Sequence, residues 1–202
     1  MMTLSIEKCI QAWTNSFKEM KAQADVVFLG DSLVYYGEFA PLFPDKVVCN
    51  LGLRGDSIKG MIDRIDQIRI LNPDSVFLMA GINDVACLSE GEFKILYSRL
   101  LDTIVHTIPK VTLVVQSILP VNTQHFSISC NNAQIVVFNR IIELIVKERD
   151  HLFLDLYSLY AENGQLPSSL TTDGIHLKSE AYEKWYDSVR LFSLEHCSKR
   201  KF

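Results

Sequence analysis

Five short runs of apolar and β-branched residues recur along the chain, and longer segments with helical periodicity separate them. The runs cover residues 25–29, 46–50, 75–79, 111–117 and 151–155. Near-continuous apolar strands are typical of a parallel sheet that is buried on both faces. We therefore expect an α/β fold, namely a three-layer αβα sandwich around a five-stranded parallel sheet with right-handed crossovers.

The segments between these runs predict the helices. They lie at about 58–71, 91–107 and 133–149, with a last helix at about 179–195 and an amphipathic opening helix at about 4–23. Ser89 and Glu92 have the spacing of a capping box at the start of the second of these helices. Because 202 residues are too few for two ordinary domains, residues 1–202 are expected to form a single domain.

Charge and composition narrow the class of partner. The net charge is −4 and the one basic cluster is 199–201, so nucleic acid is not an expected partner. No stretch approaches the roughly 18 apolar residues of a membrane span. The five cysteines are scattered without Cys-x-x-Cys pairs or histidines at ligand spacing, which favours reduced thiols in a cytoplasmic protein and no metal site. The opening segment lacks a signal-peptide pattern, although a signal peptide removed from the chain would leave no trace.

Glycines and polar residues follow the first three predicted strands at the point where each strand ends. Residues 30–32 read Gly-Asp-Ser, a glycine-rich turn spans 52–55, and Gly-Ile-Asn-Asp stands at 81–84. In a sheet of order 2-1-3-4-5 the first strand lies between the other two, so Ser32 should lie between this turn and Asn83.

This arrangement suits acyl transfer. A serine Oγ that attacks an ester carbonyl creates an oxyanion, which backbone N–H groups at glycine and an Asn amide can stabilise. Near the end of the chain, Asp173 and His176 stand three residues apart in a turn before the last helix. The carboxylate can orient the imidazole that deprotonates Ser32.

Together these motifs resemble the GDSL, or SGNH, hydrolases. The blocks are Gly30-Asp31-Ser32-Leu33, Gly55 in "LGLRGDS", Asn83 in "GIND" and Asp173-Gly174-Ile175-His176, which stand in the family's order between about residues 25 and 192. The resemblance implies a flavodoxin-like fold and esterase or acylhydrolase activity without a metal or other cofactor.

Residue by residue, the resemblance implies that Ser32 is the nucleophile and an oxyanion donor through its backbone N–H. Gly55 would supply a second backbone donor and Asn83 a side-chain donor. His176 would be the general base, and Asp173 the acid that orients it. Pro120 and Asn139 also match the family and are expected to be structural.

Four further residues are candidate substrate contacts. Asp31 stands beside the nucleophile, where a structural hydrogen-bonding role is the stronger expectation, and Arg54 lies in the glycine-rich turn. Tyr35 would line an acyl pocket or belong to the core. His125 lies in a loop after the fourth strand, at 119–132, and could contact substrate or act as an alternative base.

The sequence Gly-Asp-Ser occurs twice, and the second copy, at 55–57, is part of Arg-Gly-Asp-Ser, which also occurs in adhesion ligands. We expect Gly55 to serve the site, whereas Asp56 and Ser57 turn the chain and cap the helix near Ile58. The expected function is hydrolysis of a small-molecule ester, with short-chain acyl or O-acetyl groups that carbohydrate could carry. Acyl transfer by the same residues and a non-catalytic adhesion module are the alternatives.

Overall fold

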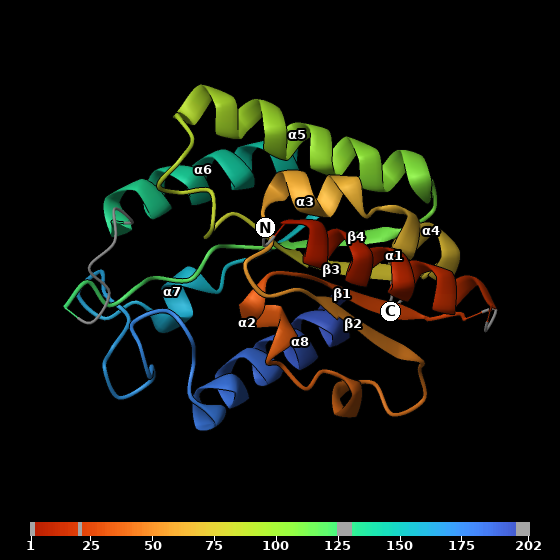
Figure 1. The fold of residues 1–202 in the computed structure, drawn as a ribbon. Helices are drawn as coiled ribbons and strands as arrows, with labels where there is room; N and C mark the ends of the chain where they lie inside the picture. The colour runs from red at the N-terminus through yellow and green to blue at the C-terminus, as the bar shows by residue number, and fades with distance from the viewer. Residues whose placement is uncertain (1–2, 20–21, 125–130, 197–202) are drawn as a thin grey trace.

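The computed structural model describes residues 3–19, 22–124 and 131–196 and confirms the predicted sheet (Figure 1). Five parallel strands lie in the order β2-β1-β3-β4-β5. Their bounds are β1 Val26–Gly30, β2 Val48–Gly52, β3 Ser75–Met79, β4 Thr112–Gln116 and β5 Leu152–Leu154. This is the flavodoxin-like order, in which β1 lies between β2 and β3.

The central strands are buried on both faces, as their unbroken apolar sequences predict. Because successive side chains point to opposite faces, Val27 and Leu29 of β1 join one hydrophobic core while Val26 and Phe28 join the other. Gly30 at the end of β1 is level with Gly52 in β2 and Met79 in β3. The residues that follow these three strands therefore meet at one edge of the sheet.

Two layers of helices cover the sheet (Figure 1). One face carries α1 Thr3–Glu19, α3 Ile58–Asp63, α4 Asp66–Leu71, α5 Glu90–Thr107 and α6 Asn132–Glu148. The other carries α2 Ser32–Tyr35, the 3-10 turn η1 Ala40–Leu42 and α8 Tyr182–His196, with η2 Ser179–Ala181 leading into α8 and the short α7 Tyr157–Tyr160 after β5. The capping box at Ser89 and Glu92 is confirmed at the start of α5.

The helix predicted at 58–71 is in fact two helices, because the chain breaks at Arg64 and Ile65. Arg64 leaves the helical conformation and turns its side chain beneath the sheet edge, where it donates to the backbone oxygen of Leu51 at 2.8 Å. The opening helix is described over Thr3–Glu19; 20–21 lie outside the described residues, and 22–23, which were predicted to be helical, are not. The short α2, α7 and η1 were not predicted.

Candidate active site

Ser32 is the first residue of α2 and follows the end of β1 by two residues. Asp31 precedes it as the N-cap, and Asp31 Oδ1 accepts a hydrogen bond from Leu33 N at 2.9 Å. The Ser32 hydroxyl is thus left free to point away from the helix, and its Oγ lies 2.8 Å from His176 Nε2. The first N–H groups of a helix have no intrahelical acceptor, which leaves the Ser32 N–H available as a donor.

His176 is held by the turn that precedes η2. Its Nδ1 lies 2.6 Å from Asp173 Oδ2, and Asp173 Oδ1 also accepts from the backbone N of Ile175 and of His176, at 3.0 and 2.8 Å. Gly174 adopts φ +95°, a conformation that favours glycine and lets the chain reverse between the two side chains. The structure therefore places Ser32, His176 and Asp173 in one hydrogen-bonded row.

The Asp173 carboxyl is suited to remain ionised. Partial burial opposes ionisation, but hydrogen bonds from the His176 ring and from two backbone N–H groups outweigh it and lower the pKa of Asp173. An anionic Asp173 fixes the Nδ1–H tautomer of His176, which presents a basic Nε2 to the serine.

Gly55 and Asn83 come from the loops after β2 and β3, the two strands on either side of β1. Gly55 has φ +72°, where a Cβ would be strained although the space around it is open. Asn83 Nδ2 donates to the backbone oxygen of Asp56 at 2.8 Å, which uses one of its two amide hydrogens and ties it to the Gly55 turn. Leu53 N donates to Gly30 O at 3.0 Å, so this turn is also bonded to the end of β1.

A buried polar cluster lies beneath these loops. Arg64 Nε and Asp56 Oδ2 form an ion pair at 2.8 Å, with both side chains almost fully buried. Asp84 Oδ2 accepts from Ile58 N, and burial raises the pKa of Asp84 to about 6. Burial likewise raises the pKa of Asp31 to about 7, against the opposing effect of the Leu33 N–H.

Asp31 does not lie where a substrate could reach it. The residue is 0% exposed, one carboxyl oxygen caps α2, and the other finds no hydrogen-bond partner among the described residues. This burial gives no support to the prediction of Asp31 as a substrate contact. The structural role that we also expected for Asp31 fits its contacts.

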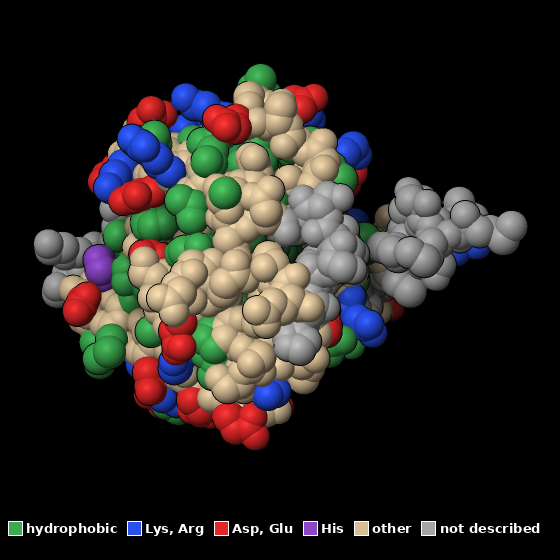
Figure 2. Space-filling model, turned by 90° about the vertical axis from the view of Figure 1, so that its left-hand side faces the viewer, with side chains coloured by type: hydrophobic (Ala, Val, Ile, Leu, Met, Phe, Trp, Pro, Cys, Tyr) green, Lys and Arg blue, Asp and Glu red, His purple; other side chains and the backbone are tan. Residues whose placement is uncertain are grey.

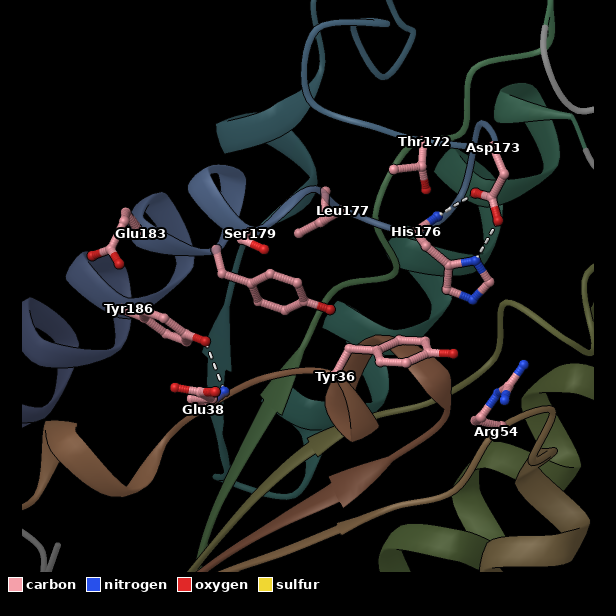
Figure 3. A pocket seen from close by; sticks show the side chains of 11 residues that line it. Tyr36, Glu38, Arg54, Thr172, Asp173, His176, Leu177, Ser179, Glu183 and Tyr186 are labelled. Atoms are coloured by element: carbon pink, nitrogen blue, oxygen red, sulfur yellow. Dashed lines mark hydrogen bonds and ion pairs between the residues drawn. The ribbon is translucent and has the colours of Figure 1, made fainter.

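A cavity of about 580 Å³ opens beside His176 and Asp173 (Figure 3). Tyr36 and Arg54 lie at its end near His176, and Glu38, Glu183 and Tyr186 lie at the other end. The full lining is Tyr36, Glu38, Arg54, Thr172, Asp173, His176, Leu177, Ser179, Tyr182, Glu183 and Tyr186. A polar cleft with aromatic walls thus runs from the imidazole along α8.

Tyr36 and Arg54 form the wall nearest to the reacting atoms. The Tyr36 ring packs edge to face against the His176 imidazole with centroids 5.6 Å apart, and the Arg54 guanidinium lies 5.7 Å from the centre of the Tyr36 ring. Both side chains reach solvent. Arg54 therefore lines the cavity, and its role as a substrate contact stays a prediction.

The other candidate contacts fare differently. Tyr35 is 46% exposed but does not line the cavity, whereas its neighbour Tyr36 does. His125 lies outside the described residues. Sequence reasoning missed Glu38, Glu183 and Tyr186, because only the packing of α8 beside α2 brings them together.

Asn139, on α6, holds a loop behind the site. The Asn139 side chain both accepts from Ile118 N at 2.7 Å and donates to Ile118 O at 2.8 Å, which fixes the segment after β4. This agrees with the structural role expected for Asn139.

Within 3–19, 22–124 and 131–196, no group of three or more His, Cys, Asp or Glu side chains could hold a metal ion.

Figure 2 shows the end of the molecule that lies to the left in Figure 1. Its centre is mostly backbone and uncharged polar side chains, and basic and acidic side chains occur together toward its upper and lower margins.

No helix in the described part of the chain is long and apolar enough to cross a membrane.

Comparison with known proteins identifies the family. Residues 28–184 match the model of the GDSL-like Lipase/Acylhydrolase family. The chain belongs to this family. Its members are esterases and acylhydrolases, and the protein is an ester hydrolase of this type. A search of the curated proteins found no match.

Solved structures share the fold. The chain is 21% identical, with a TM-score of 0.79, to a candidate platelet activating factor from Streptococcus pneumonia, over 95% of this chain and 98% of that one. A GDSL-like lipase from Bacteroides thetaiotaomicron is 21% identical with a TM-score of 0.73, over 88% and 90%. An acetyl xylan esterase is 17% identical with a TM-score of 0.69, over 84% and 98%. At this identity the likeness concerns the fold.

Proposed function

We propose that the protein hydrolyses short-chain carboxylic esters, with O-acetyl groups on polar alcohols such as carbohydrate as the favoured class. Ser32 is the nucleophile, His176 the general base and Asp173 the residue that orients His176. The observation that carries the proposal is the row of contacts from Ser32 Oγ through both ring nitrogens of His176 to Asp173, beside an open polar cavity.

The reaction follows from this row. Ser32 Oγ bonds to the ester carbonyl carbon while its proton moves to His176 Nε2, and the carbonyl π electrons move onto oxygen. The N–H groups of Ser32 and Gly55 and the free amide hydrogen of Asn83 stabilise that oxyanion. The intermediate then expels the alcohol, which takes the proton from Nε2. A water repeats the sequence on the acyl-serine and releases the acid and free Ser32.

The cavity supports a polar alcohol rather than a long acyl chain. Its walls carry tyrosine rings together with carboxylates and a guanidinium, which can stack on and hydrogen-bond to a hydroxylated leaving group. An extended alkyl chain would instead need an apolar channel. The fold shared with an acetyl xylan esterase adds support to the O-acetyl class.

Two alternatives use the same residues differently. Acyl transfer shares the acyl-serine step and differs only in the acceptor that attacks it. An adhesion role for 54–57 has less support, because Asp56 is 7% exposed and paired with Arg64 instead of being presented to a partner.

The first experiment measures hydrolysis of p-nitrophenyl acetate by the wild type and by His176→Ala. Loss of the base should lower kcat by about 10³-fold or more, since members of a triad act as a unit. His106→Ala is the matched control, because His106 is exposed on α5, away from the site. Wild-type activity in His176→Ala would contradict the assignment of the base.

A second measurement tests the substrate class. Model esters of increasing acyl length should show highest kcat/KM at acetyl, and acetylated sugars should release acetate. A preference for long acyl chains would contradict the short-chain proposal. Product analysis with an added alcohol acceptor separates hydrolysis from acyl transfer, because transfer yields a new ester instead of free acid.

A further inference from the structure

Arg64 makes four hydrogen bonds beneath the site and does not line the cavity beside His176. It is 3% exposed and lies at the break between α3 and α4. Its guanidinium contacts four groups: Asp56 Oδ2 at 2.8 Å, Gln67 Oε1 at 3.0 Å, Leu51 O at 2.8 Å and Gly30 O at 3.2 Å.

Two of these contacts hold strand ends. Gly30 O belongs to the last residue of β1, two residues before Ser32, and Leu51 O lies near the end of β2. A single nitrogen, Nη2, donates to both carbonyls. Arg64 thus fixes the end of the nucleophile's strand relative to the strand that leads to the Gly55 turn.

The third contact extends this link to the oxyanion donors. Asp56 directly follows Gly55, and its carboxylate is paired with Arg64 while its backbone oxygen accepts from Asn83 Nδ2. The second carboxylate oxygen of Asp56 accepts from Ser57 N, so the side chain cannot rotate freely. Arg64 is therefore bonded to Gly30, two residues before Ser32, and to Asp56, which follows Gly55 and binds Asn83. Ser32, Gly55 and Asn83 are the three proposed oxyanion donors.

We infer that Arg64 is a positioning residue that holds the Gly55 turn and Asn83 at the correct distance from Ser32. The inference rests on the proposed function for its effect on rate. A planar guanidinium is required, because its rigidly arranged N–H groups can donate to acceptors in several directions. A lysine ammonium on a flexible stem cannot bind all four acceptors at once.

The test compares Arg64→Lys with Arg69→Lys, since Arg69 lies on α4 in an exposed pair with Asp66. Arg64→Lys should lower kcat for p-nitrophenyl acetate by about 10- to 100-fold with little change in KM, because small misplacements of a catalytic group have effects of this size. Arg69→Lys should match the wild type.

A double-mutant cycle with Asn83→Ala separates positioning from general destabilisation. If Arg64 acts through the oxyanion donors, its effect on kcat should shrink several-fold once Asn83 is already removed. Equal effects of Arg64→Lys in both backgrounds, measured well below the unfolding temperature, would overturn the inference.

Amide hydrogen exchange gives a readout that does not need activity. Residues 52–57 should exchange faster in Arg64→Lys than in Arg69→Lys, with the remaining sheet unchanged. Unchanged exchange in 52–57 would overturn the inference even if the rate falls. A wild type that is inactive on every ester would refute the proposed function instead, and the exchange data would still decide whether Arg64 holds the turn.

A second variant covers the case in which Arg64→Lys does not fold. Replacing the pair together, as Arg64→Met with Asp56→Leu, removes both buried charges and can preserve stability. A folded double variant with wild-type kcat would contradict a positioning role, whereas a reduced kcat with unchanged KM would support it.

Discussion

The two Gly-Asp-Ser copies, at 30–32 and 55–57, differ in their position relative to the helix that follows. In the first copy the aspartate is the N-cap, because Asp31 Oδ1 accepts from Leu33 N. In the second the serine is the N-cap, because Ser57 Oγ accepts from Gly60 N at 3.1 Å. A shift of one residue in the helix start therefore gives identical tripeptides different roles.

The shift decides which serine can react. Ser57 has its hydroxyl oxygen engaged by a helix N–H, whereas Ser32 is relieved of capping by Asp31 and turns its hydroxyl toward His176. The glycines differ as well. Gly30 lies in β1, where a Cβ would overlap the Val34 side chain, whereas Gly55 has open space and needs its positive φ. Identical sequence is therefore weak evidence for identical function.

The largest difference between the two serines should appear in the esterase activity of their alanine variants. Ser32→Ala removes the proposed nucleophile and should lower kcat for p-nitrophenyl acetate by about 10³-fold or more. Ser57→Ala removes only a helix cap and should keep kcat within about tenfold, since the backbone around Gly55 has other hydrogen bonds. A fluorophosphonate probe should label Ser57→Ala and leave Ser32→Ala unlabelled. Labelling of Ser32→Ala would show that another residue is the nucleophile.

Replacing the aspartate of each Gly-Asp-Ser copy by asparagine should change the free energy of unfolding in opposite directions for Asp31 and Asp56. The pKa of Asp31 is about 7 in the folded protein against 3.8 as its ordinary value, so folding favours its neutral form. The stability from neutral Asp31 is fully present below about pH 4 and is lost as pH rises through 7. Asp31→Asn stays neutral and can still cap α2, so at pH 8 it should be more stable than the wild type by on the order of 2–4 kcal/mol.

Asp56→Asn should instead destabilise the protein by about 3–5 kcal/mol, because it leaves the buried Arg64 guanidinium without its counter-charge. Urea unfolding at pH 8 and pH 4.5 measures both variants, and the advantage of Asp31→Asn should shrink at the lower pH. Destabilisation by both substitutions at pH 8, or an advantage of Asp31→Asn that does not depend on pH, would break the contrast.

Much of the fold and site could be predicted from the sequence because the strands are buried on both faces. Continuous apolar runs such as 75–79 have few alternative structures, and a parallel sheet brings the residues after them to one edge. The Asp173/His176 spacing and the family resemblance both pointed to the pairing of Ser32 with His176, although the two residues stand 144 residues apart.

The residues that escaped prediction are the ones whose surroundings come from distant segments. Arg64 was overlooked because charged residues are usually exposed. It does carry a signal, since it lies three residues after Met61 and four before Ile68, on the apolar side of the predicted helix. Glu38 and Glu183 line one cavity only because α8 packs beside the segment that follows α2, which neither segment encodes by itself.

The smallest expected difference between Ser57→Ala and Ser32→Ala is in the free energy of unfolding. Ser57→Ala removes the cap of α3 and should lower the free energy of unfolding by about 1 kcal/mol. Ser32→Ala removes no cap, so the unfolding free energy should stay within about 0.5 kcal/mol of the wild type. The urea midpoint at constant slope measures both. An equal loss in the two variants would mean that Ser32 shares the capping of α2 with Asp31, and the division between a capping and a reacting serine would then be less sharp than the hydrogen bonds indicate.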